Sequence, residues 1–308
     1  MAEPATGAGL AVACVAPADL HVAVDPLTGR VEADQGTLAL PAADAAAVEH
    51  VLRIAEVEGL RPLVLGAGGP GLEAVLREVV GLGAAVRRVD WPGGDVGPHG
   101  LLEELAADEA ALARALADAL TVEKAPVRLV VCADRSLVRG TGALPGFLAH
   151  ELGAAQALGL VALSAAPGSG TVRAERRLAG GRREILEVPL PAVCSVEAAG
   201  VRLRRADLTG ALVAAGAPVP VHRPGAAGRP SMRVRGSRPF VPRPRVVPAP
   251  TGTARERLLA LTGALSEREP PTVLGPLEPG EAAGILLSYL DRNGFAPVGP
   301  AGAGPSER

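Results

Sequence analysis

The chain has 308 residues, which is enough for one large domain or two modest ones with a sizeable core. Its 31 basic and 33 acidic side chains give a net charge of -2, with no general attraction to nucleic acid or anionic lipid. Aromatic residues make up only 2%, which argues against base-stacking surfaces. No apolar run reaches the roughly 18 residues of a membrane span, and the N-terminus lacks the basic region of a signal peptide. We therefore expect a cytoplasmic protein.

Short apolar runs alternate with helical patterns from residue 10 to residue 197. This alternation predicts an α/β fold, doubly wound around a mainly parallel sheet. Strands are expected at 10–15, 61–65, 85–90, 127–132 and 160–163. Amphipathic helices are expected from residue 44, from residue 72, between residues 101 and 120, and from residue 144. The turn-rich segment 21–33 predicts a small hairpin after the first strand.

The pattern changes after the fifth expected strand. Residues 171–178 and 183–190 flank Ala179-Gly180-Gly181 and predict an antiparallel hairpin. A buried strand at 190–196 and a short helix within 204–216 complete a nucleotide-binding-type α/β domain, residues 1–215.

A different composition begins at residue 216. Residues 216–252 are rich in Pro and Arg, contain no acidic residue and show no periodicity, which predicts an extended arm. The arm is either a linker or a strap on an acidic partner. Residues 253–308 form a C-terminal tail, with helices expected at 255–265 and 279–289.

Catalytic and metal-binding patterns are absent from the sequence. Cys14, Cys132 and Cys194 are far apart, and each lies in an apolar run, so we expect buried thiols rather than a zinc site or a disulfide framework. The five histidines form no close motif with Ser or Cys. We therefore predict no catalytic residue and no metal ligand.

The first of two glycine-rich loops follows the strand at 61–65. Gly66, Gly68 and Gly71 match GxGxxG, and Asp90 ends the next strand about 20 residues further on. In dinucleotide-binding proteins such glycines let the backbone approach a pyrophosphate at a helix N-terminus. The loop is therefore a candidate NAD site, a contact for a phosphate or ribose, or a simple tight turn.

The second loop contains Arg139-Gly140-Thr141-Gly142 between a strand and a helix. The Arg139 guanidinium, the Thr141 hydroxyl and backbone N–H groups at this position are all suited to a phosphate. The alternative is that Thr141 only caps the helix.

Five short motifs in this order resemble the beta subunit of electron transfer flavoproteins. Residues 41–49, PAADAAAVE, are similar to that family's NPxxxxAxE, and the Arg139 to Gly142 loop is similar to its QTG loop. The other matches are Gly69-Pro70 through Gly83-Ala84, LPAV at 190–193, and RRADLTGAL around Leu208. The Pro-rich arm and tail resemble those of the diverged actinobacterial members associated with the mycofactocin redox system.

The resemblance implies a heterodimer whose alpha subunit holds most of the FAD, with AMP or a second FAD in this subunit. It also implies a donor dehydrogenase and a membrane-associated quinone oxidoreductase as acceptor. Leu208 corresponds to the leucine that recognises the donor. The nucleotide would touch Ala13, Asp44, Gly68, Gly69, Ala133, Asp134, Ser136, Arg139, Gly140 and Thr141. The chain departs from the family by Val15 and Ala16 in place of Lys and Arg, and by Gly140 in place of Gln.

Two other functions fit the same fold class. The first is an NAD-dependent oxidoreductase that uses the GxGxxG loop and Asp90. The second is a non-enzymatic scaffold or stress protein that binds an adenine nucleotide as a homodimer. We expect no nucleic acid partner for any of the three.

Overall fold

The computed structural model describes residues 9–21, 23–25, 27, 31–32, 37–91, 108–137, 140–225, 249–262 and 273–295. The chain forms two units, Met1–Val241 and Pro242–Arg308, and each is considered by itself.

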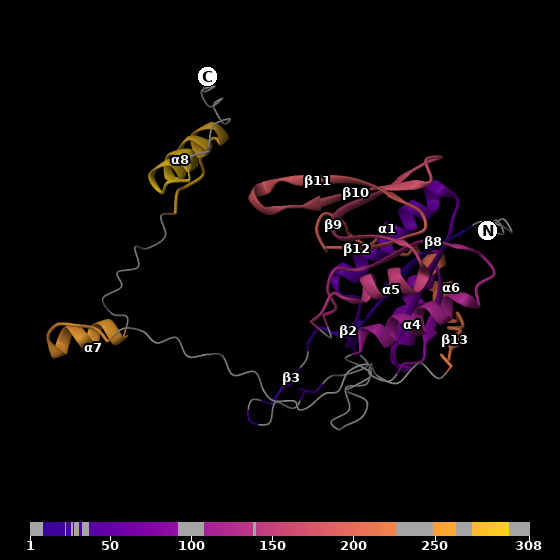
Figure 1. Ribbon diagram of the computed structural model, residues 1–308. Helices are drawn as coiled ribbons and strands as arrows, with labels where there is room; N and C mark the ends of the chain where they lie inside the picture. Colours follow the sequence, from indigo (N-terminus) through magenta and orange to yellow (C-terminus); the bar gives the residue numbers. More distant parts are fainter. Residues whose placement is uncertain are drawn as a thin grey trace, which may run out of the picture. The chain divides into compact units, whose positions relative to one another are not determined.

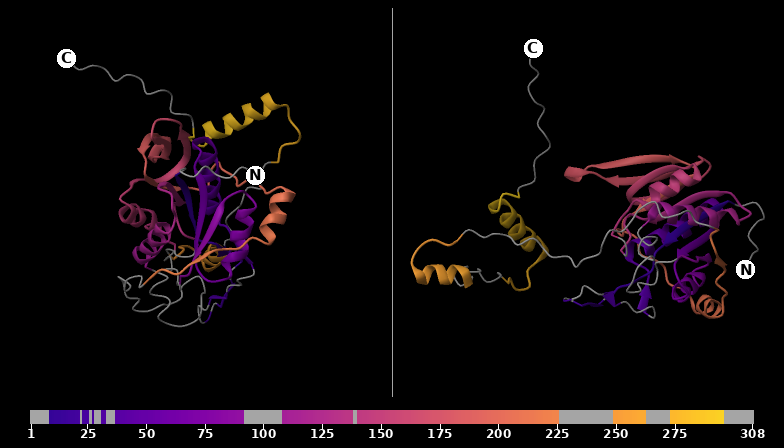
Figure 2. Two further views of the ribbon diagram at one scale, coloured as in Figure 1. Left: turned by 90° about the vertical axis from the view of Figure 1, so that its right-hand side faces the viewer. Right: turned by 60° about the horizontal axis from the view of Figure 1, so that its bottom comes forward.

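Within the described residues, the first unit is built on a nine-stranded sheet with helices on both faces (Figures 1 and 2). The strand order is β11-β10-β9-β12-β8-β1-β6-β7-β13. The strands are β1 (Leu10–Val15), β6 (Arg61–Ala67), β7 (Ala85–Val89), β8 (Val127–Ala133), β9 (Ala155–Ala166), β10 (Thr171–Arg177), β11 (Arg183–Pro189), β12 (Ala192–Val196) and β13 (Val221–His222). The helices are α1 (Ala42–Glu58), α2 (Leu72–Val80), α4 (Glu109–Thr121), α5 (Leu144–Leu152) and α6 (Leu208–Ala215).

The central strands confirm the predicted doubly wound fold. Strand β1 pairs in parallel with β6 on one side and with β8 on the other. The chain runs outward from β1 through β6 to β7, and then returns to the opposite side of β1 to form β8 and β12. The winding direction therefore reverses between β1 and β8, which is the position where open α/β sheets commonly bind ligands.

The core explains why the central strands are apolar without a break. All six residues of β1 are buried, because helices cover both faces of the sheet. Ala11 and Ala13 pack in the cluster that contains α1 and α2. Leu10 and Val12 face the other way, into the cluster that contains α4 and α5.

The antiparallel part of the sheet lies at the far end from β13. Strand β9 pairs in parallel with β12 and in antiparallel fashion with β10, and β11 forms the edge. Gly180, with φ of 71°, lies in the turn between β10 and β11, as the sequence predicts. Strand β9 is longer than the predicted strand at 160–163, and the β10–β11 hairpin extends from the body of the sheet (Figure 1).

Small strands follow β1. Strand β2 (Ala18–Asp19) pairs with β5 (Leu38–Ala39), and β3 (Ala23–Val24) pairs with β4 (Val31–Glu32). The second pair confirms the hairpin that was predicted for residues 21–33.

Part of the expected arm joins the sheet. Strand β13 pairs in parallel with β7, so residues 221–222 continue the sheet instead of leaving it. Residues 226–248 of the arm, and residues 101–107 of the long helix expected before β8, lie outside the described residues.

The second unit contains α7 (Ala254–Thr262) and α8 (Pro279–Arg292), near the predicted helices of the tail. Residues 263–265, which were expected to continue the first of them, lie outside the described residues. Among the residues that the structure describes, no helix is both long and apolar enough to cross a membrane.

An ion-pair cluster ties α1 to the segment that leads into α6. The Glu49 carboxylate is 3% exposed and accepts hydrogen bonds from the backbone N–H of Arg204 at 3.0 Å and from its guanidinium at 3.1 Å. Arg53 donates to the same carboxylate at 2.7 Å. Burial by itself would raise the pKa of Glu49, but the hydrogen bonds from Arg204 and Arg53 outweigh it and lower the pKa below its usual value.

We predict that Glu49→Gln lowers the free energy of unfolding by about 2 kcal/mol at pH 7, since Arg204 then loses a buried ionic partner. The loss of stability should shrink as the pH falls below about 4.3. The stabilisation from a lowered carboxyl pKa is complete only above the pKa of the unfolded state, and it disappears as the pH falls toward the pKa of the folded state. Urea unfolding at several pH values measures both effects. Glu187→Gln, on exposed β11, is the control and should change stability little. A loss of unfolding free energy that does not change with pH would contradict the role of the ionised Glu49 carboxylate in this cluster.

Candidate functional site

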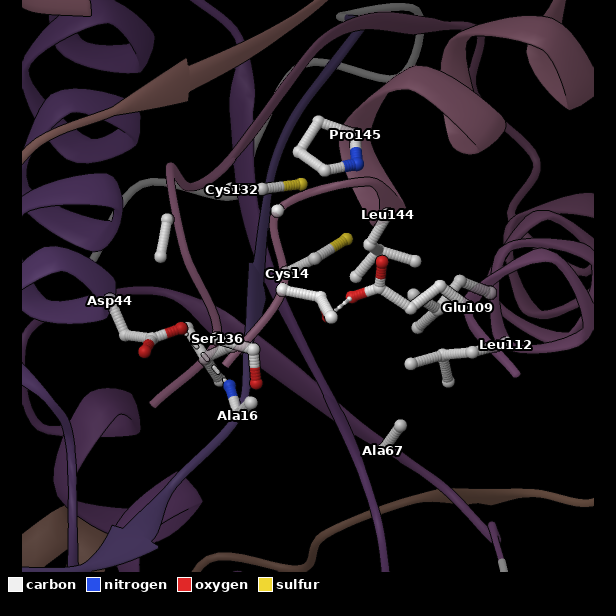
Figure 3. Close-up of a pocket in the computed structure, with 15 residues that line it drawn as sticks. Cys14, Ala16, Asp44, Ala67, Glu109, Leu112, Cys132, Ser136, Leu144 and Pro145 are labelled. Atoms are coloured by element: carbon white, nitrogen blue, oxygen red, sulfur yellow. Dashed lines mark hydrogen bonds between the residues drawn. The ribbon is translucent and has the colours of Figure 1, made fainter. Parts of the chain in front are cut away.

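A cavity lies at the reversal point of the sheet (Figure 3). The last residues of β1 and β8 form its floor, and Ala67 at the end of β6 also lines it. The remaining walls come from the start of α1, the start of α4 and the turn before α5. The space that water can enter is about 30 Å³, which is room for about two water molecules.

The turn before α5 is held by its own backbone. The N–H of Ser136 donates to the carbonyl of Thr141 at 2.7 Å, and the N–H of Gly140 donates to the carbonyl of Ser136 at 2.8 Å. Gly142 is required by close approach, since a Cβ at this position would overlap the carbonyl oxygen of Asp134. These contacts hold the described residues of the turn in place, and Thr141 lines the cavity.

A carboxylate from α4 occupies the donors of this turn. Glu109 is the first residue of α4 and is 6% exposed. The Thr141 hydroxyl donates to Glu109 Oε1 at 2.6 Å, and the N–H of Ala143 donates to Glu109 Oε2 at 3.0 Å. Figure 3 shows Glu109 pointing into the cavity between Leu144 and Leu112.

A second buried carboxylate faces the cavity from α1. Asp44 is 2% exposed, lies in the first turn of that helix, and accepts a hydrogen bond from the N–H of Ala16 at 3.0 Å (Figure 3). A helix N-terminus stabilises negative charge at this position. The described lining thus contains two carboxylates, and no Lys, Arg or His belongs to it.

Two thiols form part of the cavity floor. Cys14 and Cys132 are directly paired across β1 and β8, and their side chains lie near each other (Figure 3). The hydrogen bond with Cys14, together with burial, raises the pKa of the Cys132 thiol well above its usual value. Burial also raises the pKa of Cys194 to about 12. All three cysteines are free and buried, in agreement with the prediction from the sequence.

The other glycine-rich loop lies at the same sheet edge but outside this cavity. Ala67 lines the cavity, whereas Gly68 and Gly69 do not. The Gly68 carbonyl accepts a hydrogen bond from the buried Arg88 guanidinium at 2.9 Å, and Arg88 also pairs with Asp90 at 2.8 Å. A pyrophosphate fingerprint belongs to the loop after the first strand of such a sheet, and here the glycines follow the second. The position of the loop argues against the NAD-dependent alternative.

The predicted site residues divide into four groups. Asp44, Ala133, Ser136 and Thr141 line the cavity together. The others that the structure describes lie near this edge but outside the lining; they are Ala13, Gly68, Gly69, Asp134 and Gly140. Arg139 lies outside the described residues. Leu208 lies on α6, away from this lining, and is 77% exposed.

Sequence reasoning missed Glu109. The long helix was expected to run from residue 101, so nothing placed this carboxylate at a helix start. The local signal was Asp108, whose side chain caps α4 by accepting from the N–H of Ala111 at 2.9 Å. An Asp-Glu pair before an apolar helical pattern is typical of a helix N-terminus.

No model of a known protein family matches the chain, and no curated protein matches it either.

We predict that the three native thiols react with a disulfide reagent such as DTNB at least about 100-fold more slowly in the folded chain than in denaturant, because burial keeps them protonated and covered. Absorbance of the released thiolate measures the rate. Ser169→Cys, at an exposed turn position, provides a positive control that reacts at once. Fast labelling of Cys132 in the folded protein would show that the cavity opens.

Proposed function

We propose that this chain is the beta subunit of a heterodimeric electron transfer flavoprotein. It would accept electrons from a dehydrogenase and pass them to a respiratory acceptor through FAD shared with an alpha subunit. The observation that carries the proposal is the reversal point of the doubly wound sheet, where the ends of β1 and β8 bring together four residues of the motifs that carry the family resemblance: Asp44, Ala133, Ser136 and Thr141. The acceptor would be a membrane-associated quinone oxidoreductase, and the complex would work in the cytoplasm.

In this proposal the flavin, when bound, supplies the redox chemistry, and the protein positions it and tunes its potential. The cavity of this chain does not fit a nucleotide as it stands, because its space is about 30 Å³ and Glu109 takes two donors of the Thr141 turn. The proposal therefore places the FAD with the alpha subunit. This chain contributes one wall of the flavin cleft and the surface that meets the donor.

The donor surface in this proposal is α6. Leu208, Leu212 and Val213 are 77%, 69% and 56% exposed, an apolar group on one short helix. Asp207 caps the helix by accepting from the N–H of Gly210 at 2.6 Å. Gly210 also lies against the carbonyl of Gly81 at the end of α2, where a Cβ would overlap it. A small apolar anchor on a fixed helix suits a transient redox encounter, whose interfaces are small.

Co-expression with a candidate alpha subunit tests the proposal. The expected result is a yellow 1:1 complex on gel filtration, followed at the protein and flavin absorption maxima. A preparation that contains neither the complex nor bound flavin would overturn the proposal. A homodimer with bound AMP or ATP would support the scaffold alternative, and NAD binding that Asp90→Ala abolishes would support the oxidoreductase alternative.

Leu208→Ala in that complex should slow reduction by the donor dehydrogenase about tenfold at low donor concentration, since loss of an apolar anchor costs roughly 1.4 kcal/mol of association free energy. The donor is chosen from purified dehydrogenases by its rate with the wild-type complex, and stopped-flow absorbance follows the flavin. Val122→Ala removes a similarly exposed apolar side chain, 49% exposed, at the end of α4 and should change nothing. Release of flavin by Leu208→Ala would contradict the role of Leu208 in contacting the donor dehydrogenase.

A further inference from the structure

We infer that Glu109 determines the specificity of the cavity: its carboxylate fills the place of an anion at the Thr141 turn, so that this subunit takes no phosphate group there. The inference rests on the proposed function, because it concerns the cavity in which the family resemblance places AMP or a second FAD. It departs from that resemblance, since it removes the nucleotide from this subunit.

The first argument is that two donors of the turn are already used. The Thr141 hydroxyl and the backbone N–H groups of the turn are, among the described groups, those that would meet a phosphate. In the structure, each oxygen of the Glu109 carboxylate accepts from one of them, at 2.6 Å from the Thr141 hydroxyl and at 3.0 Å from the N–H of Ala143. A carboxylate at a helix N-terminus is held by the same forces as a phosphate oxygen. Glu109 therefore acts as the chain's own anion.

The second argument is that Glu109 is fixed in place. It begins α4, and the Asp108 side chain caps that helix start. Leu112 and Leu116, one and two turns further on, are 2% exposed and line the same cavity. The carboxylate leaves the turn only if its side chain rotates within a packed wall or if the helix start moves.

The third argument is electrostatic. A phosphate at this position would approach the buried carboxylates of Glu109 and Asp44, both of which line the cavity. Both carboxylates are buried whereas Thr141 is exposed, so water screens their repulsion of an anion only in part. The lack of space acts in the same direction, since the cavity has room for about two water molecules.

The test measures binding of AMP and of inorganic phosphate by isothermal titration calorimetry. The full-length wild-type chain should show no saturable binding of either. Glu109→Ala, which frees both donors and removes the charge, should show saturable binding of AMP, with an affinity at least about tenfold above the detection limit that bounds the wild type. Glu151→Ala removes an exposed acidic side chain from α5 and should behave as the wild type does.

A second variant removes the charge with a smaller risk to folding, since Glu109→Gln keeps the size of the side chain. Circular dichroism and the melting temperature without ligand show whether each variant is folded. Phosphate should raise the melting temperature of a folded Glu109→Ala chain and should leave that of the wild type unchanged. If neither variant folds, the AMP content of the wild-type heterodimer, measured by mass spectrometry after acid release, decides alone.

Two results would overturn the inference. One is AMP in stoichiometric amount in the wild-type heterodimer, and the other is a folded Glu109→Ala chain that binds AMP no better than the wild type. A flavin-containing heterodimer that also holds AMP would refute this inference and leave the proposed function standing. AMP binding gained by Glu109→Ala in a chain that forms no flavin complex would do the reverse.

Discussion

The parallel pairing of β1 with both β6 and β8 is the constraint on which the rest of the structure depends. The pairing runs in register from Leu10 to the end of β1 on the β6 side and covers most of the strand on the β8 side. Because parallel strands end at one edge, three loops that are distant in sequence meet around Ala16. This arrangement of the loops determines where the cavity, its two thiols and the Thr141 turn lie.

Buried carboxylates at helix starts give this edge its chemical character. Asp44 and Glu109 each satisfy backbone N–H groups from another part of the chain, so they act as internal ligands that close the edge. A sheet edge closed in this way agrees with the proposal that the alpha subunit holds most of the FAD. In the same proposal, the exposed apolar side chains of α6 form the contact surface for the donor dehydrogenase. The Glu49 cluster connects the two regions, since it anchors the segment before α6 to α1.

The fold was largely predictable because each buried strand is a short apolar run between helical repeats. The Gly180 turn and the short helix expected within 204–216 were also local signals, readable without tertiary contacts. The contact between Glu109 and Thr141 was not, because it spans 32 residues and depends on how α4 and α5 pack. The same holds for β13, whose two residues lie in a Pro-rich segment and pair with β7 only through the tertiary fold. The GxGxxG match left three interpretations open for a related reason, since its meaning depends on which strand precedes it.

Strand β11 has one further consequence, because it is the outer strand of the sheet and has no neighbour beyond it in the described part of the chain. Its outward row of backbone donors and acceptors is a template onto which another extended chain could add. Arg183 pairs with Glu175 and Glu184 pairs with Arg176 across the hairpin, so charged side chains crowd this border. Desolvating such charges is unfavourable, and the hairpin thereby opposes stacking of molecules into fibres or aggregates.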